Sequence, residues 1–116
     1  MKNIMTTDKA TYSRKAVREC IAEINALNMT VSRKKDHGPR LSEVKNAYDS
    51  CFKKTKCCVF STYYGCTPLS KYLKAYDRDA PKKDLDGLLK ESVRYLQDHI
   101  NSIQASIDYG KVNTID

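Results

Sequence analysis

The feature that most constrains the fold is a run of aliphatic residues near the C-terminal end of the chain. Its members are separated by four, three, four, three and four positions: Leu89, Val93, Leu96, Ile100, Ile103 and Ile107. This is the spacing of a helix that packs lengthwise against another helix, and we term these six residues the heptad seam. Because Pro81 can begin a helix and Gly110 can end one, the seam predicts a helix over residues 81–109, roughly 43 Å long.

Apolar residues also recur at helical spacing in two earlier segments. In residues 11–28 the apolar face is formed by Val17, Cys20, Ile24 and Leu27. In a second segment, which Pro39 can begin, it is formed by Leu41, Val44, Tyr48, Cys51 and Phe52. We expect this second helix to continue without a break to Tyr64. Residues 57–64 also favour a strand, but the chain offers no second strand of similar quality for pairing. Thr67 and Pro68 can then begin a short helix over residues 68–76.

These segments predict an all-α protein, a three- to four-helix bundle in one domain that spans residues 1–116. We expect residues 1–10 and 111–116 to be frayed, and residues 28–39, which lose the helical period, to form a basic loop. The predicted helix over residues 11–28 is too short to cover the whole heptad seam. A homodimer along the uncovered end of the long helix is therefore also expected.

All of the excess positive charge lies in the N-terminal half of the chain. Thirteen Lys and Arg residues accompany six Asp and Glu residues in residues 1–58, whereas residues 59–116 hold eight of each. An excess confined to one half is typical of a chain with an anionic partner. The residues expected to contact that partner are Arg33, Lys34, Lys35, Arg40, Lys53, Lys54 and Lys56. The alternative is a solvated basic surface that only keeps the protein soluble.

Gly65 lies in a turn between two expected helices, as in a helix-turn-helix motif. The second helix of that motif packs through apolar residues about six and nine positions after the turn glycine. Lys71 and Lys74 occupy those positions, so the standard motif is excluded. Together with Arg78, these lysines are expected to form an exposed basic stripe that contacts phosphate.

Several tyrosines lie next to lysines, an arrangement in which the rings can stack on unpaired bases while the ammonium groups hold phosphates. The spacing of Tyr72 and Tyr76 with neighbouring leucines favours burial in the core instead. Tyr63 and Tyr64 are adjacent, so we expect one of them on the surface.

Four of the five cysteines lie close together in the sequence: Cys51, Cys57, Cys58 and Cys66. A structural zinc site usually shows two short ligand pairs, and these cysteines are separated by five, zero and seven residues. A zinc cluster is therefore the weaker alternative, and small buried core residues are the favoured one. An odd number of cysteines without a signal-peptide pattern predicts a non-secreted protein in a reducing, cytoplasmic compartment.

The sequence contains no pattern that indicates catalysis. It has no glycine-rich phosphate loop, and its two histidines, His37 and His99, are not paired as in a zinc hydrolase. We therefore expect no enzyme and no cofactor. No apolar run approaches the ~18 residues that a membrane span needs, so no membrane partner is expected.

The sequence thus predicts a small non-enzymatic protein that binds nucleic acid through its basic N-terminal half. The alternative is an adaptor or inhibitor, in the style of a phage or mobile-element protein, that docks on an acidic surface of host machinery.

Overall fold

The computed structural model describes residues 10–33, 40–61 and 67–116. Its helices are α1 (Arg14–Arg33), α2 (Leu41–Thr55), α3 (Pro68–Asp77) and α4 (Lys82–Asp108), with a 3-10 helix η2 (Cys58–Phe60) after α2. Two short strands, β1 (Thr11–Tyr12) and β2 (Asn113–Thr114), lie near the chain ends. The expected all-α helical bundle is confirmed. None of the helices in these ranges is long and apolar enough to cross a bilayer.

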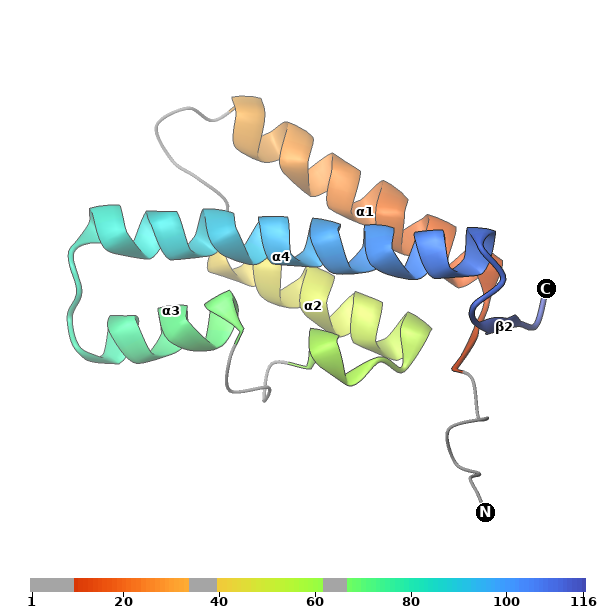
Figure 1. Cartoon of the computed structure of the whole chain (residues 1–116). Helices are drawn as coiled ribbons and strands as arrows, with labels where there is room; N and C mark the ends of the chain where they lie inside the picture. The colour runs from red at the N-terminus through yellow and green to blue at the C-terminus, as the bar shows by residue number, and fades with distance from the viewer. Residues whose placement is uncertain (1–9, 34–39, 62–66) are drawn as a thin grey trace, which may run out of the picture.

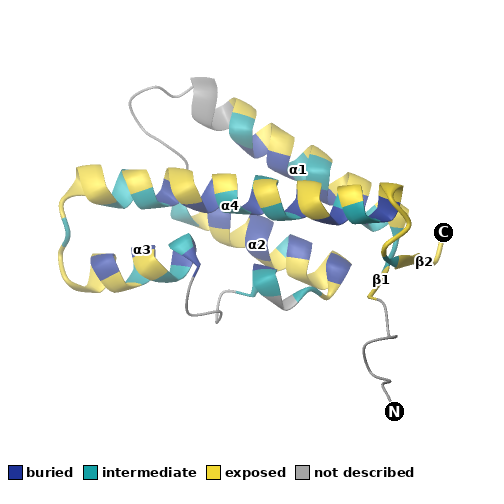
Figure 2. Cartoon of the chain, in the orientation of Figure 1, coloured by how far each residue is buried: buried dark blue, intermediate teal, exposed yellow. Residues whose placement is uncertain are grey.

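The long helix α4 organises the bundle. It runs the length of the molecule, with α1 along one side, α3 beside its N-terminal half and α2 against the remaining side (Figure 1). All six residues of the heptad seam are buried, and Leu96 and Ile100 have 0% exposure. The buried residues of α4 form one stripe that faces the other helices (Figure 2). A single chain therefore buries its own seam, and a homodimer would have to use another surface.

Helix α2 ends earlier than the sequence pattern predicts. The Lys56 N–H donates to the Phe52 carbonyl at 2.7 Å, and Lys56 adopts the left-handed conformation, with φ of 60°. The buried Thr55 hydroxyl donates to the Cys51 carbonyl at 2.7 Å and accepts from the Cys57 N–H at 3.2 Å. The chain then turns through η2 and buries Phe60 completely in the core. The predicted unbroken helix to Tyr64 is therefore wrong at Lys56, and residues 62–64 lie outside the described residues.

Residues 28–33 are helical, so the basic loop predicted over residues 28–39 is wrong in its first half. This stretch contains neither Gly nor Pro, and nothing in it breaks the helix. The Asn28 side-chain amide also donates to Gln97 Oε1 at 2.8 Å, which joins α1 to α4.

The prediction that residues 111–116 are frayed is wrong, because this segment is ordered against the start of α1. Strand β2 pairs in parallel with β1, with Thr11 opposite Asn113. The Asp116 carboxylate then accepts hydrogen bonds from the Ser13 hydroxyl at 2.7 Å and from the backbone N–H groups of Arg14 and Lys15. Because the first N–H groups of a helix have no partner inside it, this carboxylate acts as an N-terminal cap for α1.

Candidate nucleic-acid interface

The basic residues predicted to form one patch are separated along α2. Arg40 is exposed immediately before the helix, whereas Lys53 and Lys56 are exposed at its other end. At 1.5 Å per residue, Arg40 and Lys53 are about 20 Å apart along the axis. Arg33 is the last residue of α1, and Lys34 and Lys35 lie outside the described residues. The described members of the predicted set therefore do not form a single continuous surface.

Lys54 is exposed, but its ammonium group reaches toward α1. Its Nζ lies 3.6 Å from Glu23 Oε2 and 3.9 Å from Glu19 Oε1. The Ser50 hydroxyl donates to the same Glu23 oxygen at 2.8 Å. Lys54 thus joins α2 to α1, and its charge is offset by two carboxylates. We exclude it from the candidate interface.

The side of α2 that faces away from the bundle carries exposed residues at helical spacing. We term them the α2 outer face: Lys45, Asp49, Phe52, Lys53 and Lys56. Lys45 and Phe52 are seven positions apart and Phe52 and Lys56 are four apart, which brings them onto one side of the helix. The buried residues on the opposite side are Val44, Ala47 and Cys51.

Phe52 is the unexpected member of this face. The apolar pattern predicts it as part of the α2 core stripe, but the residue is 41% exposed. A phenyl ring is therefore held on a regular helix among three lysines. In the described part of the chain, no carboxylate lies within ion-pair distance of Lys45, Lys53 or Lys56.

A second basic surface lies on α3. We term it the α3 basic stripe: Lys71, Lys74 and Arg78, all exposed and three or four positions apart. The opposite side of α3 buries Leu69 and Tyr72. Tyr72 therefore belongs to the core, as predicted.

Tyr76 was also predicted to be buried, but it is 60% exposed. It stacks on Tyr72 with ring centroids 6.2 Å apart. Two positions separate Tyr76 from Lys74 and from Arg78, or about 200° around the helix, so its ring lies away from the α3 basic stripe. Among the described residues, no other exposed ring lies next to this stripe.

The cysteines do not gather around a common point in the described residues. Cys20 and Cys51 are buried between α1 and α2, where their thiols share a hydrogen bond. That hydrogen bond, together with burial, raises the pKa of the Cys51 thiol, and zinc binds thiolates. No group of three potential metal ligands occurs among the residues that the structure describes. The described cysteines therefore give the zinc alternative no support. The Cys58 side chain and Cys66 lie outside the described residues.

Comparisons with family models, curated proteins and solved structures find no match for this chain. We therefore base the proposed function on its own residues. Sequence reasoning missed Lys45 and the exposure of Phe52. The spacing of Lys45, Phe52 and Lys56 could have indicated them, because it places an aromatic ring between lysines on one face of a helix.

Proposed function

We propose that this protein is a non-enzymatic binding protein that holds single-stranded nucleic acid on the α2 outer face. The observation that carries the proposal is the exposure of Phe52, 41% for the residue, among Lys45, Lys53 and Lys56. Exposed aromatic rings stack on unpaired bases, and neighbouring ammonium groups hold the phosphates. A duplex keeps its bases stacked on each other, so this arrangement favours a single strand.

The recognition expected from this face is independent of base sequence. Lysine ammonium groups contact phosphate oxygens and read no base edge, and stacking tolerates every base. If the three lysines each neutralise one phosphate, the slope of log affinity against log salt is about −2 for a single strand. The α3 basic stripe would add phosphate contacts for a longer strand. We also propose a reducing, cytoplasmic location and, through a surface other than the heptad seam, a homodimer.

Fluorescence anisotropy with a labelled thymidine dodecamer tests the proposal. Reversing the three charges together (Lys45→Glu, Lys53→Glu and Lys56→Glu) is expected to abolish binding at low salt. The matched control reverses three exposed lysines of α4: Lys82→Glu, Lys83→Glu and Lys90→Glu. We expect the control to retain most of the affinity. Equal losses in both variants would mean that only net charge matters, and would refute a site on α2.

The same variants separate nucleic acid from an acidic protein as the partner. Affinity capture from lysate is carried out with and without nuclease. The proposal predicts that captured proteins disappear after nuclease treatment, because a nucleic acid bridges them. A protein that remains bound after nuclease, and is lost with the α2 variant but not with the α4 variant, would establish the adaptor function instead.

A further inference from the structure

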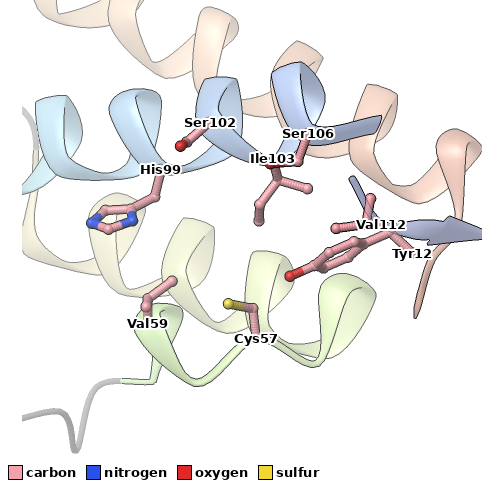
Figure 3. A pocket seen from close by; sticks show the side chains of 8 residues that line it. All are labelled: Tyr12, Cys57, Val59, His99, Ser102, Ile103, Ser106 and Val112. Atoms are coloured by element: carbon pink, nitrogen blue, oxygen red, sulfur yellow. The ribbon is translucent and has the colours of Figure 1, made fainter. Parts of the chain in front are cut away.

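A pocket of about 140 Å³ lies beside the C-terminal half of α4. One wall is α4 itself, the opposite wall is the chain that follows α2, and β1 with the segment before β2 closes one end (Figure 3). The pocket is far from the α3 basic stripe in the fold and includes no residue of the α2 outer face. It is therefore a separate feature from the proposed nucleic-acid interface.

Its size corresponds to one aromatic ring. A cavity of about 150 Å³ in a protein core accommodates benzene. The apolar part of the lining comes from Tyr12, Val59, Ile103 and Val112. A six-membered ring with one small substituent therefore fits the space and contacts apolar side chains from three separate segments.

Polar groups line the α4 side of this pocket. His99, Ser102 and Ser106 are three and four positions apart, so they follow one side of the helix. His99 is held in position by aromatic neighbours: its ring centroid is 4.2 Å from that of Tyr95 and 6.4 Å from that of Phe60. Tyr95 is itself fixed, because its hydroxyl donates to the Val59 carbonyl at 2.8 Å. An imidazole held in this way is a pre-positioned hydrogen-bonding group.

The far end of the pocket is also built before any ligand arrives. The Asn113 N–H donates to the Ala10 carbonyl at 2.9 Å, and the Ile115 N–H donates to the Tyr12 carbonyl at 3.2 Å. These bonds hold Tyr12 next to Val112. Small-molecule sites are typically preformed and mostly apolar, with a few polar groups that orient the ligand.

We propose that this pocket binds a phenol-sized aromatic molecule that carries one hydrogen-bonding group. The ring packs among Tyr12, Val59, Ile103 and Val112. The hydroxyl group is directed toward His99 and Ser102, which are three positions apart on α4. The Cys57 thiol lies on the opposite wall and points into the space (Figure 3), so its accessibility reports whether the pocket is occupied.

The test measures the rate at which iodoacetamide alkylates Cys57 in the full-length protein, followed by peptide mass spectrometry. Phenol is expected to slow this reaction in a saturable way, by about tenfold at ten times its Kd. Alkylation of the buried Cys20 and Cys51 serves as the control, and phenol should leave it unchanged. A Cys57 rate that does not respond to phenol, together with no saturable amide shifts in an NMR titration, would overturn the proposal.

Two comparisons test how the ligand is oriented. Toluene has the shape of phenol without the hydroxyl, and we expect it to bind several-fold more weakly. In a His99→Phe, Ser102→Ala variant, phenol and toluene should bind equally well. If the variant keeps the full preference for phenol, the assigned hydrogen-bonding wall is wrong. Amide shifts confined to residues outside the pocket would likewise refute the site.

Discussion

Helices α2 and α4 both carry apolar residues at helical spacing, but these residues are buried to different degrees. Every residue of the heptad seam of α4 is buried. On α2, Cys51 is fully buried, whereas Phe52, the next residue, is 41% exposed. Full burial of a phenylalanine stabilises a fold by about 1.5–3 kcal/mol, and Phe52 forgoes part of that gain. The seam of α4 therefore contributes its full apolar area to the core, whereas the partly exposed Phe52 is the feature on which the proposed binding surface rests.

The largest expected effect is on stability. Ile100→Ala should lower the free energy of unfolding by about 2–5 kcal/mol, because it leaves a cavity in the centre of the core. Phe52→Ala should lower it by less, about 1–2 kcal/mol, because about two-fifths of this residue is already exposed to water. Urea denaturation of both variants measures the contrast. Similar losses of unfolding free energy in the two variants would contradict a larger contribution of the α4 seam to stability.

The next effect concerns the affinity for a single strand. Here a substitution on α2 is expected to matter more than one at the end of α4. Phe52→Ala should weaken binding of a single strand by about 1–3 kcal/mol, or roughly 5- to 150-fold, while the salt slope stays unchanged. Tyr109→Ala is the matched control, because Tyr109 is 78% exposed and lies outside both basic surfaces. We expect it to bind as the parent does. A loss of affinity with Tyr109→Ala but not with Phe52→Ala would place the aromatic contact elsewhere.

A smaller effect is expected at the end of α2. Thr55→Val removes the hydroxyl that donates to the Cys51 carbonyl and accepts from the Cys57 N–H. This should lower the free energy of unfolding by about 1–2 kcal/mol. Amide hydrogen exchange should quicken most at Cys57 and in η2. Unchanged exchange there would show that the turn is held by the burial of Phe60 alone.

The smallest effect concerns the cap on α1. Hydrogen bonds from the Ser13 hydroxyl and from the backbone of Arg14 and Lys15 hold the pKa of Asp116 below its ordinary value of 3.8. A carboxyl group with a lowered folded-state pKa stabilises the fold above its unfolded pKa, and this contribution is lost as pH falls through the folded pKa. Asp116→Asn should therefore lower Tm slightly at neutral pH, and the difference should shrink below about pH 4. Thermal melts across this range test it. A difference that grows on acidification would contradict the assigned cap.

The two helices also differ in how well the sequence predicts where they begin and end. The heptad seam, Pro81 and Gly110 are local signals, and α4 follows them to within a residue at each end. The end of α2 depends on the burial of Phe60 and on the Thr55 hydroxyl, which are consequences of packing. Phe52 adjoins the core stripe in the sequence, and only the positions of the neighbouring elements decide that it is left outside.

The chain ends illustrate the same limit. Pairing of β1 with β2 and the cap by Asp116 join residues about a hundred positions apart. Strands of two residues carry no periodicity, so no local pattern predicts them. For the proposed binding surface, composition indicates an excess of basic residues in the N-terminal half. It could not reveal that Lys54 faces Glu19 and Glu23, or that Arg40 lies far from Lys53.

The most direct test of the central claim is a photochemical cross-link between the protein and a single strand that contains 5-iododeoxyuridine. This base cross-links to the aromatic ring on which it stacks, and mass spectrometry identifies the residue. The account predicts that the cross-link forms at Phe52, even though Tyr76 and Tyr109 are more exposed, at 60% and 78%. A cross-link at Tyr76 or Tyr109 with none at Phe52 would contradict it.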